Sequence, residues 1–264
     1  MGRTVRFCLI VFLTLALPGV SAASGAIAVI IGNKSYAAAG HDVPDVDYAH
    51  NDAEAFRRFA REVLGLEERK ILDYRDVTSA EMLRLFGTAE NPRGRLHDLA
   101  RLGNREVYVF YSGHGVPKMG DGPAKGYLLP VDVPAATPDF GGYPLARLIA
   151  HLEDLPVDRV TVFLDACFSG LSQAGTLVPG TSGSFGVAVA APEPKANIAV
   201  LTATAFGEAQ YAHWLPEKEH GAFTYYTLSA LYGDADHDRY GRADGRVSAS
   251  EVQSYLTDRM SHDV

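Results

Sequence analysis

The stretch RVTVFLDACFSG, residues 159–170, decides how the chain folds and where its chemistry lies. Its residues from Val160 to Leu164 form an apolar run rich in β-branched side chains, which is typical of a buried strand in a parallel sheet. The run leads directly into Asp165, Cys167 and a glycine turn. Reactive groups of open parallel sheets gather where the strands end, so we expect a functional site here.

A second stretch, REVYVFYSGHG at residues 105–115, has the same design. Its strand, from Val107 to Tyr111, ends in the turn SGHG. If the two strands are neighbours in the sheet, His114 and Cys167 lie above the same sheet edge. The order of the two stretches leaves room between them for a crossover helix and a loop.

The rest of the chain alternates between strand and helix patterns, which predicts an α/β fold with a mostly parallel central sheet and helices on both faces. We expect Asn51 or Asp52 to cap the first helix, and Thr78 with Glu81 to form a capping box at the second. The strands are expected at 27–31, 70–74, 107–111, within 159–170 and at 196–204, and the helices at 51–65, 78–87, 144–156, 221–233 and 248–260.

The composition fits one globular domain. The chain has 264 residues, is 47% hydrophobic and carries a formal net charge of −8. That apolar content is enough for a sizeable core. Since the sequence has no basic stripe, we expect no nucleic-acid partner.

The first residues have the pattern of a secretory signal peptide. Arg3 and Arg6 precede an apolar run at 7–17, and small residues follow at a cleavage position. This predicts a signal peptide at 1–23, an exported domain at 24–264 in a secreted or periplasmic location, and no membrane contact after cleavage. The alternative is an uncleaved anchor, although the run is short for a membrane span.

The cysteine content points to chemistry. The chain has only Cys8, in the signal peptide, and Cys167, so the exported domain cannot form an internal disulfide. A cysteine thiolate is a nucleophile, and an imidazole such as that of His114 can take its proton and later donate it to a leaving amine. The backbone N–H groups of Gly115 and Cys167 would stabilise the oxyanion. The alternative is that Cys167 is a buried, inert strand-end cysteine.

Two motifs carry a family resemblance. YSGHG and DACFSG, in this order, resemble the two catalytic motifs of the caspase-like cysteine peptidases, most closely those of the metacaspase and bacterial orthocaspase branch. IAVIIGNKSY, HNDAEAF and GAFTYYTLSAL resemble further segments of that family, so the resemblance covers nearly all of the exported domain. It implies a caspase-like (caspase-hemoglobinase) fold. Phe168 departs from the pattern, since many metacaspases have histidine at this position.

The resemblance also implies roles. His114 would be the general base and acid, Cys167 the nucleophile, and Gly115 with Cys167 the oxyanion hole. Asp52 and Asp165 would line the S1 pocket and select arginine or lysine at P1, making the protein an endopeptidase for peptide or protein substrates. Their structural alternatives are a helix cap for Asp52 and a hydrogen bond to the turn for Asp165. The functional alternative is a catalytically silent caspase-fold module that binds basic segments.

Two loops remain open to interpretation. Residues 171–196 are rich in Gly, Ser, Ala and Pro and resemble an intersubunit loop, and Lys195 is their only basic residue, which makes it a possible autocleavage site. Residues 233–251 are acidic, but their spacing does not fit an EF-hand, so a solvated turn capping the last helix is the better interpretation. The sequence requires no cofactor. Many metacaspases use Ca²⁺, so Ca²⁺ is possible and the metal stays open; the oligomeric state is undetermined.

Overall fold

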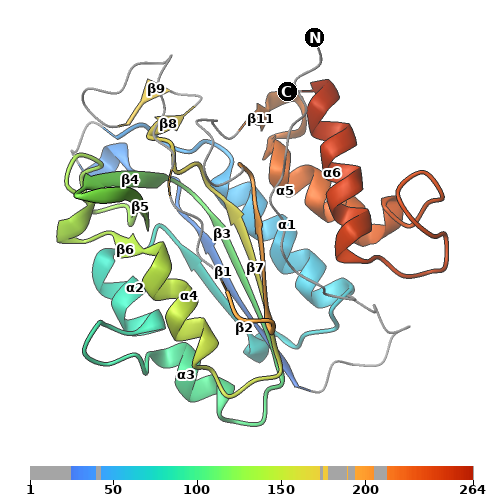
Figure 1. The fold of residues 1–264 in the computed structure, drawn as a ribbon, viewed down its shortest axis with the longest axis horizontal. Coiled ribbons are helices and arrows are strands. Elements are labelled where there is room, and N and C mark those ends of the chain that lie inside the picture. Colours follow the sequence, from blue (N-terminus) through green and yellow to red (C-terminus); the bar gives the residue numbers. More distant parts are fainter. Residues whose placement is uncertain are drawn as a thin grey trace.

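Five parallel strands form the centre of the molecule (Figure 1). The computed structural model describes residues 25–39, 43–172, 175–177, 189, 194–204 and 213–263. The strand order is β10-β7-β3-β1-β2, and each neighbouring pair is parallel. The bounds are β1 Ala26–Gly32, β2 Ile71–Arg75, β3 Glu106–Ser112, β7 Arg159–Asp165 and β10 Ile198–Thr202.

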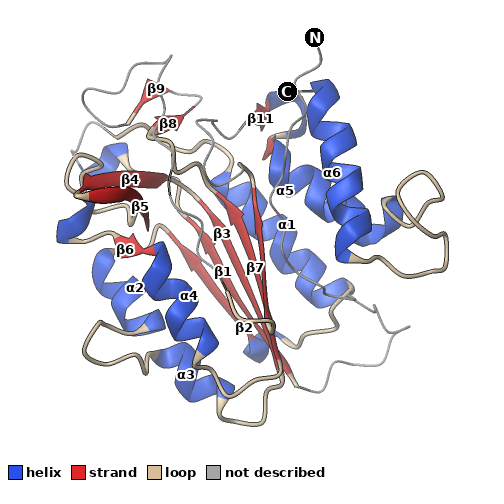
Figure 2. Cartoon of the chain, viewed as in Figure 1, coloured by secondary structure: helices blue, strands red, loops and turns tan. Residues whose placement is uncertain are grey.

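Three helices cover each face of this sheet (Figure 2). Strand side chains alternate between the faces, so Ala28 and Ile30 pack on one side while Ile27, Val29 and Ile31 pack on the other. One side holds α1 Ala49–Glu62, α5 Ala222–Ser229 and α6 Ala249–Asp263. The other holds α2 Ser79–Phe86, α3 Arg95–Ala100 and α4 Leu145–Glu153.

An aromatic cluster fixes α1 to the centre of the sheet. The Phe56 ring stacks on Phe110 of β3 at a centroid distance of 4.5 Å and lies 5.2 Å from Phe163 of β7. Burying such a side chain contributes about 1.5–3 kcal/mol each. Asp52 lies one helical turn before Phe56 on the same face, so this packing also points Asp52 inward, towards the ends of β3 and β7.

A small antiparallel sheet follows β3 and was not among the predicted elements. Glycines and prolines interrupt its three strands, so the segment shows little of the alternation that marks a strand. They are β4 Gly115–Gly120, β5 Gly122–Leu128 and β6 Tyr143–Pro144. A second small pair joins β11 Trp214–Leu215 to β12 His220–Gly221.

The predicted strands and helices are confirmed, with corrections at their ends. The helix expected at 221–233 ends at Ser229 and continues as a π-helical turn, η5 Ala230–Asp234, in which Gly233 has a φ of 122°. The capping box of Thr78 and Glu81 is confirmed. The cap expected from Asn51 or Asp52 is wrong. The N-cap is Tyr48, and the carboxylate of Asp52 is bound elsewhere.

The acidic segment before α6 forms a hydrogen-bonded turn. Glu251 accepts hydrogen bonds from the backbone of Ser248 and Arg242, both at 2.7 Å, and Ser248 Oγ caps the helix in return. Asp236 accepts the backbone N–H groups of Asp244 and Gly245. These carboxylates therefore bind main chain, as expected of a turn that caps the last helix. Among the described residues, no group of three or more His, Cys, Asp or Glu side chains is arranged to hold a metal ion.

The structure does not test the predictions for the signal peptide and for most of the loop at 171–196. The signal peptide at 1–23 lies outside the described residues, as does most of the loop at 171–196. Within the part that is described, no helix is both long and apolar enough to cross a membrane.

Candidate active site

The ends of β3 and β7 bring the two motifs together. Ser112 pairs with Asp165 in the parallel register, and His114 and Cys167 each follow two residues later. The backbones stay in contact beyond the strands. A Cβ added to Gly115 would lie 2.8 Å from the carbonyl oxygen of Cys167. The strands are neighbours as predicted, and His114 and Cys167 lie at the same edge of the sheet.

The His114 ring is buried and held from both sides. Its Nε2 lies 2.7 Å from the carbonyl oxygen of Pro44, and its ring lies 4.6 Å from the ring of Tyr36 between centroids. A carbonyl only accepts, so in the neutral ring Nε2 carries the proton and Nδ1 carries the lone pair. Burial lowers the pKa of His114 to about 4, so the imidazole is neutral near pH 7.

A buried polar network fixes the backbone of this histidine. The N–H of His114 donates to Tyr36 Oη at 3.0 Å, and Tyr36 Oη donates to the Leu129 carbonyl at 2.9 Å. The hydroxyl of Tyr111 lies 2.8 Å from the His114 carbonyl. Asn33 joins the network through its side-chain amide, which donates to Leu129 at 3.1 Å. Each member is buried and hydrogen-bonded, so the network specifies one position for His114.

Cys167 lies on a short, buried turn. Its Sγ lies 2.9 Å from Ser169 Oγ, and the residue is 6% exposed. The Phe168 ring turns back over Gly115, where a Cβ would lie 2.8 Å from the ring. Glycine is therefore required at position 115, and Phe168 serves as packing beneath the site.

Asp52 is buried at this edge and accepts several hydrogen bonds. Ser112 Oγ donates to it at 3.0 Å, and the N–H of Gly221 donates at 3.1 Å. The Nδ1 atom of His220 lies 2.8 Å from Oδ1 of Asp52. Burial raises the pKa of Asp52, while these hydrogen bonds and the nearby imidazole oppose that rise.

Asp165 is buried at the same edge of the sheet, on the other side of Gly221. Its Oδ2 accepts from Thr224 twice, from the backbone N–H at 3.1 Å and from Oγ1 at 2.6 Å. A Cβ added to Gly221 would overlap this Oδ2 and would lie 3.2 Å from Asp52 Oδ2, so both carboxylates lie against one backbone position. Burial and the charge of Asp52 raise the pKa of Asp165 to about 7. Asp165 thus bonds the start of α5 rather than its own turn.

Two buried carboxylates this close repel each other, and a cation bound beside them relieves both the repulsion and the desolvation. The arrangement suits a guanidinium or an ammonium group. A guanidinium has the further advantage that it can bind carboxylates through two parallel hydrogen bonds.

Sequence reasoning missed several neighbours of the site. Ser112 carries a findable signal, because it precedes His114 by two residues just as Asp165 precedes Cys167. Nothing in the sequence distinguishes His220 from an ordinary histidine, yet it contacts Asp52. The Pro44 carbonyl has no sequence signal, since every residue type offers a carbonyl.

Lys195 lies at the opposite end of the sheet. Its backbone N–H donates to Glu153 Oε1 at 2.8 Å, and its ammonium lies 3.5 Å from Oε2. Two residues later, the carbonyl of Asn197 accepts the backbone N–H of Val160 at the start of β7. Since β7 has 7 residues, Lys195 is roughly 20 Å from Cys167.

The chain was compared with known protein families and with curated proteins. The family model described as the caspase domain matches residues 26–254, which include both strand ends and every described pocket residue. A search of curated proteins found no match. The family match and the five-stranded parallel sheet together confirm the fold expected from the resemblance.

Proposed function

Because the chain belongs to the caspase family of cysteine peptidases, we propose that it is an endopeptidase of the metacaspase or orthocaspase type that cleaves after arginine or lysine. The observation that carries the proposal is the pair of buried carboxylates, Asp52 and Asp165, beside the edge that holds His114 and Cys167.

In the proposed reaction, Cys167 Sγ attacks the carbonyl carbon of the scissile bond. The thiol proton passes to His114 Nδ1, because Nε2 is engaged by the Pro44 carbonyl. His114 is neutral at rest, so the proton moves as the attack proceeds rather than beforehand. The N–H groups of Gly115 and Cys167 stabilise the oxyanion, and one such donor contributes about 10²- to 10³-fold in kcat.

The remaining steps return the enzyme to its starting state. His114 donates its proton to the leaving amine, and the C–N bond breaks to leave an acyl thioester on Cys167. A water molecule then attacks the thioester while His114 takes the water proton and passes it to the thiolate. The acid product leaves with the basic side chain that held it in the pocket.

The P1 side chain is proposed to bind beside Asp52 and Asp165. A bound cation stabilises the ionised form of Asp165, so its pKa, about 7 in the empty pocket, falls on binding. Part of the energy of binding is therefore used to ionise Asp165. Neutral or acidic P1 side chains do not stabilise the ionised carboxylate, so they bind more weakly. An aspartate at P1 would add a third negative charge.

Export and regulation complete the proposal. Residues 1–23 act as a signal peptide and residues 24–264 form the exported domain. The reaction uses no resident cofactor. Ca²⁺ would act on activation rather than on the bond-breaking step. Cleavage after Lys195 in a second copy would divide the chain into two segments.

The test is a P1 peptide library assayed with wild-type protein and with Cys167→Ala, each with and without a calcium chelator. Hydrolysis after Arg and Lys by the wild type, and none by Cys167→Ala, is the expected result. Preference for Asp, or equal hydrolysis by the variant, would overturn the proposal. Tight binding of basic peptides with no turnover would instead favour a silent binding module.

A further inference from the structure

We propose that His220 is a specificity-determining residue of the basic pocket, whose ring occupies Asp52 when the pocket is empty and yields it to an arriving P1 cation. The proposal rests on the proposed function and extends it. It makes the affinity for basic residues depend on pH through the charge of this imidazole.

His220 contacts the carboxylate of Asp52 directly. His220 Nδ1 lies 2.8 Å from Asp52 Oδ1, and the next backbone N–H, that of Gly221, donates to the same oxygen at 3.1 Å. The side chain of His220 is 24% exposed, whereas that of Asp52 is 2% exposed. The imidazole therefore lies between the buried carboxylate and solvent. A guanidinium cannot donate to Asp52 Oδ1 from the same direction while the imidazole of His220 occupies that position.

His220 differs in charge from the other groups that contact the two carboxylates. The other groups that donate to the two carboxylates are neutral, namely Ser112 Oγ, the Gly221 N–H and Thr224. Among the described groups that donate to these carboxylates, His220 is the one whose side chain can carry a positive charge. In the imidazolium form it neutralises Asp52 much as a P1 cation would, so the two compete.

Charged residues face His220 from three parts of the chain. Asp52 faces it from α1 and Asp165 from β7. The ring of Tyr225 on α5 lies 6.4 Å away. The preceding turn, η4 Pro216–Lys218, carries Glu217 and Lys218, and Glu219 follows it directly.

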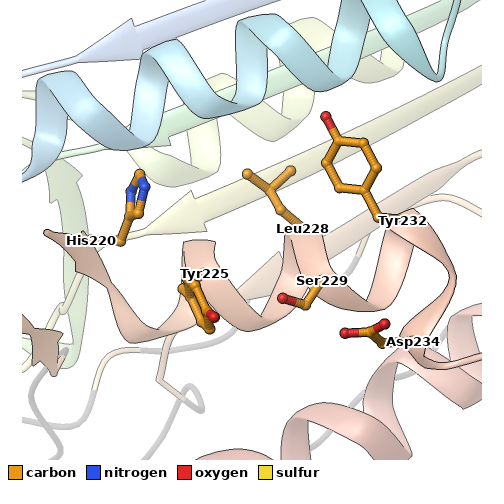
Figure 3. Close-up of a pocket in the computed structure, with 6 residues that line it drawn as sticks. All are labelled: His220, Tyr225, Leu228, Ser229, Tyr232 and Asp234. Atoms are coloured by element: carbon orange, nitrogen blue, oxygen red, sulfur yellow. The ribbon is translucent and has the colours of Figure 1, made fainter. Parts of the chain in front are cut away.

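Space for the displaced ring lies next to the pocket. Figure 3 shows His220 at one end of a groove that follows α5 towards Tyr232 and Asp234. The groove has a volume of about 280 Å³ and is lined by Tyr225 and Leu228 beside His220. His220 lies on the two-residue strand β12, directly after Glu219, whose φ of 56° marks a tight turn. When a P1 cation binds, the imidazole rotates into this groove.

The experiment compares the pH dependence of KM in the wild type, His220→Asn and His237→Asn. Asparagine keeps an N–H donor for Asp52 but cannot become charged. His237 lies on the turn after η5, away from the pocket, and serves as the control. Protonation of Asp165, whose pKa is about 7, raises KM for an Arg-P1 peptide in all three proteins as the pH falls from 8 to 5.5. Competition from His220 adds to this effect, so we expect the KM of the wild type and His237→Asn to rise about threefold more than that of His220→Asn.

A second measurement uses binding alone and distinguishes the two proposals. Benzamidine is titrated calorimetrically into Cys167→Ala and Cys167→Ala/His220→Asn at pH 6, in buffers of different ionisation enthalpy. The double variant should release fewer protons on binding. His220→Gln replaces His220→Asn if the latter fails to fold.

The two experiments distinguish failure of the role of His220 from failure of the proposed function. Equal pH profiles of KM in wild type and His220→Asn, or equal proton release, would overturn the role of His220 while cleavage after Arg and Lys stands. Absence of any preference for Arg or Lys in the wild type would overturn the proposed function first.

Discussion

His114 Nε2 and the carbonyl oxygen of Pro44 lie 2.7 Å apart although 70 residues separate them in the chain. The loop that carries Pro44 is held in place by Asp76, whose Oδ1 accepts the backbone N–H groups of Lys34 and Ser35 at 2.7 and 2.9 Å. Lys34 in turn accepts the N–H of Val46 through its carbonyl at 3.1 Å. The tautomer of His114 is therefore set by a loop that the β1–α1 connection provides.

The hydroxyl of Tyr36 is the corresponding support for the His114 backbone. In Tyr36→Phe, the buried N–H of His114 loses its acceptor, and a buried donor left unpaired costs about 1–3 kcal/mol. We expect kcat to fall about tenfold with little change in KM, because the P1 pocket is untouched. Steady-state kinetics on an Arg-P1 peptide measure both.

Tyr143→Phe is the matched control for that prediction. Its hydroxyl is also buried and donates to the Gly87 carbonyl at 3.1 Å, away from His114. It should lose stability without losing kcat. Equal kcat in Tyr36→Phe and wild type would contradict the positioning role.

The lowered pKa of His114 makes stability depend on pH. The folded state keeps the ring neutral down to about pH 4, while the unfolded chain takes up a proton near pH 6.5. Between these values the unfolded state binds more protons, so the free energy of unfolding falls as pH falls, by up to ~3 kcal/mol from this group. Urea denaturation at pH 7.5 and pH 5 measures the change.

His114→Gln isolates this contribution. Its free energy of unfolding should fall less between the two pH values than that of the wild type. A variant with the same pH dependence as the wild type would show that His114 does not titrate on unfolding in this range.

Much of this site follows from local sequence patterns, and the remainder depends on long-range contacts. The apolar runs before Asp165 and before the SGHG turn predict two strand ends, and parallel pairing makes them meet. The inward direction of Asp52 follows from its spacing to Phe56 on one helix. Pro44 lies on a loop and His220 follows a short turn. The pattern of apolar residues predicts strands and helices but not the course of such segments, so these two contacts could not be predicted.

Asp165→Asn should stabilise the folded protein and abolish the proposed specificity. Both hydrogen bonds from Thr224 reach one oxygen, Oδ2, so an asparagine carbonyl can accept both. The pKa of Asp165 is about 7 when folded, against 3.8 for an ordinary aspartate, so the folded state binds more protons between these values. Its ionisation therefore costs stability as pH rises from 4, up to ~4 kcal/mol above pH 7.

We accordingly expect Asp165→Asn to unfold at higher urea concentration than the wild type at pH 8, and at nearly the same concentration at pH 4. Cleavage after Arg should fall at least a hundredfold in kcat/KM. Asp238→Asn, in an exposed turn, should change neither quantity. A destabilised Asp165→Asn at pH 8 would show that the carboxylate is favourable where it lies.

Processing at Lys195 should occur between molecules. Lys195 is roughly 20 Å from Cys167 along β7, so a chain cannot present this bond to its own site without unfolding β10. The rate of processing should rise with the square of protein concentration, and the new chain should begin at Ala196. Lys195→Gln should block it and Lys125→Gln, on the exposed part of β5, should not. A first-order rate, or no chain beginning at Ala196, would contradict this prediction.

Gly115→Ala tests the contact between the two motifs. The added Cβ would lie 2.8 Å from the Cys167 carbonyl and from the Phe168 ring, so one strand end must shift away from the other. Overpacking of this kind costs about 1–3 kcal/mol, and a displacement of about 1 Å between reacting groups lowers kcat about a hundredfold. Kinetics and urea denaturation measure the two effects together.

Gly120→Ala provides the control on the same hairpin, because a Cβ there meets nothing within 4 Å. It should leave both kcat and the free energy of unfolding within error of the wild type. If Gly115→Ala behaved like Gly120→Ala, then the ends of β3 and β7 would tolerate separation. The chemistry proposed here requires that they do not, since the proton of Cys167 must reach a ring that the Pro44 carbonyl holds in place.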